Sequence, residues 1–174
     1  MRNPGKLIIE SLGSHHNRQN FSCGVDSLDS YLKKQAKQDV KRRIARVFVA
    51  TSDENPNAIL GFYTLSTLAI ELTQLPNELA RKLPKHPIPA ALIGRLACST
   101  LVRGQGIGKM LLMDAIKRTL VVSEDIAIYA MVVDAIDEQA QRFYEQYGFS
   151  RLAVDSGRLF LPLKSFSPGN GGFK

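Results

Sequence analysis

A glycine-rich loop in the second half of the chain has the clearest chemical meaning. Gly104, Gly106 and Gly108 follow an apolar stretch that predicts a strand, and an amphipathic helical pattern begins directly after them. A strand that enters a helix through glycines presents unpaired backbone N–H groups to an anion, typically a phosphate. The Walker A and dinucleotide loops do not fit, because Arg103 and Lys109 occupy positions where those motifs require glycine. The spacing therefore predicts a phosphate-binding loop of another class.

A basic segment near the N-terminus predicts contact with an anionic partner. The 174-residue chain has 23 lysine and arginine residues against 16 acidic residues, which gives a formal charge of +7. Ten of the basic residues and four of the acidic ones lie within residues 1–50. Such an excess raises the local concentration of anionic molecules, nucleic acid first among them, and says nothing about the fold.

This segment also has the periodicity of an amphipathic helix. An apolar residue recurs at every fourth position, which predicts a single helix from Asp26 or Ser27 to residue 44. The apolar stripe consists of Leu28, Leu32, Ala36, Val40 and Ile44. The opposite face carries Lys33, Lys34, Lys37, Lys41, Arg42, Arg43 and Arg46. Only Asp39 balances these cations, so the face is either a phosphate-binding surface or an ordinary solvated helix face.

Several classes of protein are excluded by what the sequence lacks. Two cysteines, Cys23 and Cys98, cannot form a disulfide framework, and no cluster of metal ligands follows the adjacent His15 and His16. No apolar run approaches the ~20 residues of a membrane-spanning helix, and the N-terminus lacks the features of a signal peptide. We therefore expect a reduced, cytoplasmic protein without a metal site and without membrane contact.

The rest of the pattern predicts the elements that must position these residues. Strands are expected over 6–12, 46–51, 58–70, 90–100 and 125–133, with one or two more within 149–163. Further helices are expected over 106–122 and 138–147, and a proline-rich loop over 70–90 holds a short helix over 77–82. This order predicts one α/β domain over 1–174 with a mixed sheet, ending in a frayed tail over 165–174.

The glycine loop and its surroundings resemble the acetyl-CoA site of the GNAT N-acetyltransferase superfamily. Residues 103–108 read R-x-x-G-x-G, the pattern of the loop whose backbone amides bind the pyrophosphate of acetyl-CoA in that superfamily. The resemblance implies the GNAT fold, a mostly antiparallel central sheet flanked by helices, whose strands splay apart at the acetyl-CoA site within residues 90–150. The implied cofactor-binding residues are Leu96, Ala97, Cys98, Arg103, Gly104, Gln105, Gly106, Ile107, Gly108 and Lys109.

A second motif of the same superfamily lies one strand further along. Residues 140–149 read AQRFYEQYGF and resemble its A-x-x-F-Y-x-x-x-G-F signature. The resemblance implies that Tyr144 protonates the CoA thiolate as it leaves, a task suited to a phenol with a reference pKa of ~10. Tyr147 is the alternative donor, although its place beside the Gly-Phe turn favours packing. One departure is Asp137, which stands where many GNAT enzymes have an asparagine.

Three further stretches resemble the GNAT toxins of bacterial type II toxin–antitoxin systems. They are FSCGVDSLDSYLKKQA from Phe21, LIGRLA from Leu92 and LFLPLK from Leu159. The resemblance implies acetylation of the α-amino group of aminoacyl-tRNA, which blocks translation, with residues 1–50 as the basic, substrate-facing portion. The basic face then supplies the candidate tRNA-binding residues Lys33, Lys34, Lys37, Lys41, Arg42 and Arg43. Arg95 is a further candidate for a tRNA phosphate, with a structural ion pair as the equal alternative. Most relatives have Val-Asp where this chain has Cys98-Ser99, which is tolerable if only backbone groups bind there.

The same resemblance implies partners besides tRNA. These are a ribbon–helix–helix antitoxin that masks the toxin, operator DNA bound only through the toxin–antitoxin complex, and a second copy of the chain in a homodimer. Two other functions remain open. One is a GNAT acetyltransferase for a small-molecule amine or a protein N-terminus, and the other is a basic nucleic-acid-binding module that keeps the glycine loop without catalysis.

Overall fold

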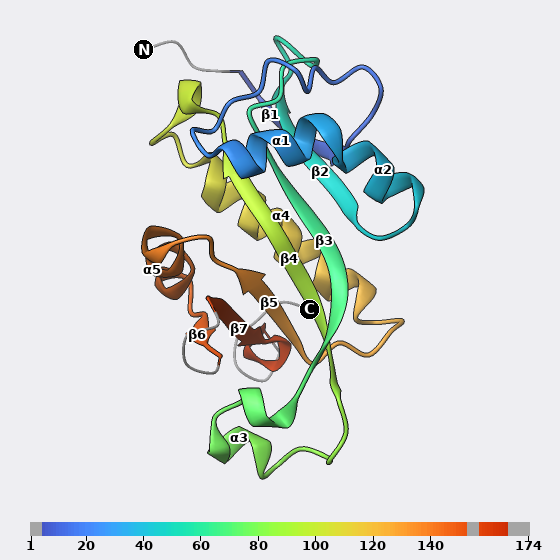
Figure 1. Ribbon diagram of the computed structural model, residues 1–174, viewed down its shortest axis with the longest axis vertical. Helices are drawn as coiled ribbons and strands as arrows, with labels where there is room; N and C mark the ends of the chain where they lie inside the picture. The colour runs from blue at the N-terminus through green and yellow to red at the C-terminus, as the bar shows by residue number, and fades with distance from the viewer. Residues whose placement is uncertain (1–4, 153–156, 167–174) are drawn as a thin grey trace. The chain divides into compact units, whose positions relative to one another are not determined.

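The computed structural model describes residues 5–152 and 157–166, which form the strands and helices drawn in Figure 1. The helices are α1 (Asp26–Lys34), α2 (Ala36–Lys41), α3 (Asn77–Ala80), α4 (Ile107–Val122) and α5 (Glu138–Gln146), with 3₁₀ turns η1 (Leu72–Gln74), η2 (Thr100–Val102) and η3 (Leu163–Phe166). The strands are β1 (Leu7–Ser11), β2 (Arg46–Ser52), β3 (Gly61–Ile70), β4 (Ile88–Cys98), β5 (Ala130–Asp134), β6 (Ser150–Arg151) and β7 (Arg158–Pro162). No helix in the described ranges has the length and hydropathy that crossing a lipid bilayer requires.

The strands form one mixed sheet in the order β1-β2-β3-β4-β5-β7-β6. β1 with β2, β2 with β3, β5 with β7 and β6 with β7 are antiparallel pairs. β4 and β5 are parallel, and their paired residues run from Ala90 with Ala130 to Ile93 with Val133. β4 continues beyond this pairing to Cys98. The structure confirms the predicted fold class, a mixed and mostly antiparallel sheet flanked by helices.

The chain divides into two compact units. Unit 1 comprises Met1–Ser66 and Gly94–Lys117, and unit 2 comprises Thr67–Ile93 and Arg118–Lys174. In unit 1, α1 and α2 lie over β2 and β3 (Figure 1). Their contact is a core of aromatic and aliphatic side chains, and the Phe62 ring of β3 stacks on the Tyr31 ring of α1 at 6.3 Å between ring centres. Burial of these apolar side chains fixes the basic helices to the sheet.

The predicted basic helix is wrong in its continuity. It breaks at Gln35 into α1 and α2, and α2 ends in a left-handed residue, Arg43, at φ 62°. The Arg43 amide donates to the Val40 carbonyl and the Ile44 amide to the Asp39 carbonyl, which is the hydrogen-bond pattern of a Schellman helix end. The chain turns away there, so Ile44 is 59% exposed and does not belong to the apolar stripe.

Unit 2 has its own core, built where β4 and β5 pair. Ile88 and Ala90 of β4 pack with Val132 of β5 and Phe160 of β7. α3 and its flanking turns, which occupy the proline-rich 70–90 segment, supply further apolar contacts to this cluster. The predicted loop is therefore a packed connection with the expected short helix inside it.

Several predicted boundaries differ from the structure. β4 begins and ends two residues earlier than expected, at Ile88 and Cys98. β5 begins at Ala130 and not at residue 125, because the amides of residues 124–126 bond to carbonyls at the end of α4 and continue its last turn. Ser165 and Phe166 belong to the 3₁₀ turn η3, so the expected tail does not start at 165, and the rest of that prediction lies outside the described residues.

Candidate active site

The glycine loop connects β4 to α4 through the 3₁₀ turn η2. Gly104 and Gly106 adopt φ of 77° and 80°, and a Cβ added to either would have no atom within 4 Å. Backbone conformation alone therefore demands glycine at both positions, and the space above them is open. Helix α4 begins immediately afterwards, with its first helical hydrogen bond from the Met110 amide to the Gly106 carbonyl at 3.1 Å. The amides of residues 107–109 have no partner within the helix, so this loop can bind an anionic group.

Two side chains of the loop have structural positions. Ile107 is buried, so its side chain belongs to the core and only its backbone is offered to a ligand. Arg103 donates from Nη2 to the Cys23 carbonyl at 2.8 Å, across 80 residues of sequence. Gly24 permits this contact, since a Cβ there would lie 2.7 Å from Arg103 Nη2. Lys109, in contrast, is exposed on the first turn of α4.

The end of β4 lies against β3 in unit 1 by an unusually close approach. A Cβ added to Gly61 would lie 2.9 Å from the Ala97 carbonyl oxygen and 2.9 Å from Leu111 Cδ1. Ala97 is buried, whereas Leu96 and Cys98 are half-buried. Burial raises the pKa of the Cys98 thiol to about 11, and the nearby Arg103 charge opposes that shift without cancelling it. Cys98 is therefore a neutral thiol at physiological pH.

The basic surface of unit 1 keeps its charge unbalanced. Six of the seven predicted face cations are exposed: Lys34, Lys37, Lys41, Arg42, Arg43 and Arg46. Lys33 is half-buried. Asp39, the acid expected to balance them, is 8% exposed and accepts a hydrogen bond from the Tyr31 hydroxyl at 2.9 Å. The single acid of residues 33–46 thus faces inward, and the outward face is cationic.

Arg95 of β4 contacts Tyr31 of α1. Its guanidinium carbon lies 3.7 Å from the centre of the Tyr31 ring, a cation–π contact. Burial of the Tyr31 ring and its hydrogen bond to Asp39 raise the pKa of that phenol, while the Arg95 charge lowers it by less. Arg95 is therefore held in a fixed orientation without an ion pair to an acid among the described residues.

Tyr144 belongs to unit 2, whereas the glycine loop, the end of β4 and the basic helices belong to unit 1. It stands on α5 and is 4% exposed, with Phe143 and Phe149 packed edge-on at 5.2 and 5.7 Å between ring centres. Tyr147 follows the end of α5 and packs edge-on against Phe143 at 5.2 Å. The structure therefore brings the glycine loop, the end of β4 and the cations together in unit 1, and it places both candidate tyrosines in unit 2.

A family model described as "Acetyltransferase (GNAT) domain" matches residues 43–151, a range that contains the glycine loop, β4 and α5. The chain belongs to the GNAT family of acetyltransferases. The GNAT fold and an acetyl-CoA-dependent acetyltransferase activity, both predicted from the glycine loop and the A-x-x-F-Y motif, are confirmed. In unit 1 of this GNAT acetyltransferase, open space over two left-handed glycines adjoins a helix N-terminus, an arrangement that can bind an anionic group.

Relatives of this GNAT acetyltransferase are toxins. It is 34% identical to the Sinorhizobium fredii protein named "Probable toxin TacT", over 94% of this chain and 96% of that protein. It is 33% identical to a "tRNA-acetylating toxin" of Mycobacterium tuberculosis, over 83% of this chain and 84% of that protein. The crystal structure of a Tyr-to-Phe mutant of KacT superposes with a TM-score of 0.87 at 32% identity, over 91% of this chain and 96% of that one. The resemblance to GNAT toxins is thereby confirmed.

Asp137 has a structural role that explains the departure from the family's asparagine. Its side chain accepts a hydrogen bond from the Ala140 amide at 2.8 Å and so caps the N-terminus of α5. Asp and Asn are equivalent in this position. Asp134, at the end of β5, instead pairs with Arg158 of β7 at 2.7 Å. Sequence reasoning missed both roles, although an aspartate directly before a helical pattern is an N-cap signal.

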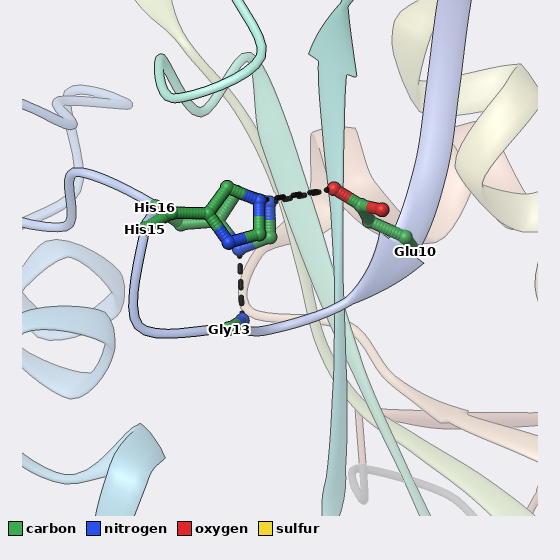
Figure 2. A network of polar contacts seen from close by, with 4 residues as sticks. All are labelled: Glu10, Gly13, His15 and His16. Carbon is green, nitrogen blue, oxygen red and sulfur yellow. Dashed lines mark hydrogen bonds and ion pairs between the residues drawn. The ribbon is translucent and has the colours of Figure 1, made fainter.

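The structure also places Glu10 beside His15 and His16, a contact that the sequence reasoning missed (Figure 2). The candidate ligand atoms of the three residues lie within 4.8 Å of one another. His16, whose side chain is fully buried, accepts the Gly13 amide at Nδ1 (2.8 Å), so its Nε2 carries the proton and donates to Glu10 Oε1 (3.0 Å). An ion at Nε2 would have to displace that proton and the Gly13 bond. The His16 contacts therefore fit a structural role that holds the 13–16 turn.

Proposed function

We propose that this chain is the toxin of a toxin–antitoxin system and acetylates the α-amino group of aminoacyl-tRNA. The observation that carries the proposal is the outward cationic face formed by residues 33–46, where the only acid, Asp39, is buried. This face lies in the same unit as the glycine loop. A small amine needs no such surface, whereas a polyanionic acceptor gains affinity from every phosphate it places there.

The comparisons support the choice of tRNA. AtaT, bound to acetyl-methionyl-tRNA in a solved structure, superposes with a TM-score of 0.85 at 30% identity, over 92% of this chain. We assign tRNA contacts to Lys33, Lys34, Lys37, Lys41, Arg42, Arg43 and Arg95. Residues 1–50 then form the substrate-facing portion, and residues 90–150 the cofactor-binding portion.

Acetyl-CoA, when bound, supplies a thioester, and this chain's residues orient it and move one proton. The loop of residues 103–109, with the amides of residues 107–109 as donors, would hold the pyrophosphate, and the backbone of Leu96, Ala97 and Cys98 would hold the pantetheine arm. As the amine nitrogen bonds to the acyl carbon, the C–S bond breaks and its electron pair stays on sulfur. Tyr144 donates its phenolic proton to that sulfur, and the proton that the amine nitrogen loses as the amide forms passes through solvent and restores the phenol. The α-amine of an ester is less basic than a lysine side chain, so it reaches the neutral form without a strong enzyme base.

We further propose that an antitoxin of the ribbon–helix–helix type masks this toxin and that the complex binds operator DNA. AtaT is bound to the C-terminus of the antitoxin AtaR in one related structure, and KacTA is bound to DNA in another. We also propose a homodimer. A pull-down of the tagged chain from its own host, followed by mass spectrometry, tests the antitoxin, and sedimentation equilibrium tests the dimer.

The acetyl acceptor is tested directly with labelled acetyl-CoA and tRNA charged with a defined amino acid. Label should appear on the aminoacyl group after mild ester hydrolysis. Label found only on protein or on polyamines contradicts the proposal and favours the small-amine or protein N-terminus alternative.

The role of the basic face is tested by reversing Lys37, Lys41 and Arg42 to glutamate. Acetylation of charged tRNA should fall strongly, and the loss should depend on salt because released counterions contribute to the affinity. The matched control reverses three exposed cations of unit 2: Arg81, Lys82 and Lys85. Equal losses in both triple variants contradict a specific role for α1 and α2.

A further inference from the structure

A pocket of about 260 Å³ opens in unit 1 between the turn after β1 and helix α2. It is lined by Leu12, Gly13, Ser14, His16, Arg18, Lys37 and Val40. We propose that this pocket binds one internucleotide phosphate of the RNA substrate, together with its ribose. The inference rests on the proposed function and adds to it a concave subsite that the basic helix face alone does not have.

The charge of the pocket comes from two cations, Arg18 and Lys37. Arg18 is half-buried, and its Nη1 donates to the carbonyls of Leu32 and Lys33 at 3.4 and 3.1 Å, at the end of α1. These bonds fix the guanidinium plane and leave its other nitrogens for a ligand. Lys37 is exposed on α2. Within residues 5–152 and 157–166, neither cation forms an ion pair with a carboxylate, so an anion in the pocket would meet two positive charges.

The floor of the pocket is held in shape by the His16 network of Figure 2. His16 accepts the Gly13 amide and donates to Glu10, whose carboxylate is thereby kept outside the lining. The hydrogen bond to His16 lowers the pKa of Glu10, so this carboxylate is ionised at neutral pH. The turn that carries Ser14 is therefore ordered before any ligand arrives, which reduces the entropy cost of binding.

The lining matches a nucleotide unit better than a free inorganic ion. Leu12 and Val40 contribute an apolar wall, on which the carbon face of a ribose can pack, and the exposed Ser14 hydroxyl can donate to a phosphate oxygen. Lys37 lies both in the pocket lining and among the outward cations of α2. An RNA chain that crosses this face would therefore place one of its phosphates in the pocket. An acidic peptide is the competing class of ligand, and it is an outcome of the test below.

The test adds one negative charge at the mouth of the pocket with Ser14→Glu. Ser14 is exposed and forms no part of the acetyl-CoA loop. A charge placed ~4 Å from a phosphate should weaken binding of uncharged tRNA about fivefold at low salt. The slope of log affinity against log salt should fall by about one, as expected for one lost phosphate contact. The matched control is Ser165→Glu, the same change at an exposed serine of η3 in unit 2, and it should bind tRNA as the wild type does.

A second variant separates charge from folding. Ser14→Cys is folded first and then modified with a thiol reagent that carries a sulfonate, and the affinity for uncharged tRNA is compared before and after modification. A loss after modification supports the pocket even if Ser14→Glu fails to fold. Unchanged tRNA binding in the modified protein overturns the proposal, and so does a loss confined to an acidic antitoxin peptide. Because uncharged tRNA cannot be acetylated, this result is independent of the acetylation assay, and the pocket and the proposed function can fail separately.

Discussion

The guanidinium of Arg95 lies 3.7 Å above the ring of Tyr31, so a residue of β4 covers a residue of α1. The same tyrosine donates its hydroxyl to the buried Asp39 of α2 at 2.9 Å. Three elements of unit 1 therefore meet at one side chain. This stack orients Arg95 and explains how this cation of β4 is kept in place although no carboxylate in the described part of the chain pairs with it.

The contact between Arg95 and Tyr31 should be measurable as a coupling free energy. A double-mutant cycle with Arg95→Met and Tyr31→Leu should give a coupling of about 1–2 kcal/mol in urea unfolding, the range of partly desolvated cation–π pairs. Arg95→Met paired with Leu28→Ala, which lies outside the stack, serves as the control cycle. A coupling near zero for Arg95 and Tyr31 would show that the stack contributes nothing to stability.

Gly61 should resist substitution by alanine. The added methyl would meet the Ala97 carbonyl oxygen at 2.9 Å, and that backbone atom can move only if β4 moves. We expect Gly61→Ala to lower the free energy of unfolding by about 1–3 kcal/mol and to raise the KM for acetyl-CoA. Gly94→Ala is the control, because its methyl would lie 3.2 Å from a side-chain atom of Thr64, which can adjust more easily. Equal costs for the two variants would argue against this close approach.

Asp137 should behave as a helix cap and not as a cofactor ligand. Removing the bond to the Ala140 amide with Asp137→Ala should cost about 1 kcal/mol of stability, and Asp137→Asn should restore most of it. The KM for acetyl-CoA should hardly differ between the alanine and asparagine variants when both are fully folded. A large rise in KM that asparagine alone rescues would instead indicate a contact with CoA.

Tyr144→Phe should abolish turnover while the protein stays folded. The ring keeps its edge-on contacts with Phe143 and Phe149, and only the hydroxyl is lost. Loss of a general acid should lower kcat about 100-fold or more, with the KM for acetyl-CoA nearly unchanged. Tyr147→Phe is the matched control and should retain most activity. The assignment is wrong if Tyr147→Phe has the larger effect on kcat.

The cysteines should be slow to alkylate in the folded protein. Burial raises the pKa of both Cys23 and Cys98 to about 11, and the hydrogen bond of the Cys23 thiol to the Asp29 carboxylate adds to the shift at Cys23. At pH 8 only about one thiol in a thousand is then a thiolate, so iodoacetamide should react slowly, and about tenfold faster per pH unit up to pH 10. Because the unfolded thiols ionise first, the free energy of unfolding should fall as pH rises from about 9 towards 11. A rate that levels off near pH 8.5 would contradict these values.

Local patterns in the sequence were enough to predict the parts of the site that depend on backbone. The alternate glycines require left-handed turns at Gly104 and Gly106, and a helix start must follow, so the loop could be placed without a structure. The sheet class followed from the order of strands and helices. The aromatic motif around Tyr144 could be placed on a helix for the same reason.

Contacts between distant residues could not be predicted in this way. The end of α2 depends on Arg43 adopting a left-handed conformation, which arginine adopts rarely and which no local pattern indicated. The inward turn of Asp39 needs Tyr31 to be buried beside it, and the Glu10 contact needs β1 to run past the two histidines. These arrangements follow from tertiary packing. Local patterns of hydrophobicity and charge in a single sequence do not reveal which distant residues will pack together.

The bond from Arg103 to the Cys23 carbonyl has a consequence for how this protein can vary. With the bond from the Thr100 amide to the Ser22 carbonyl at 2.9 Å, it fastens the segment before α1 to the segment before the glycine loop. We therefore expect substitutions in residues 21–24 to be accompanied by substitutions in residues 99–104 as relatives diverge. A swap of the first 30 residues between relatives should then damage acetyl-CoA use first, even though those residues precede the basic face.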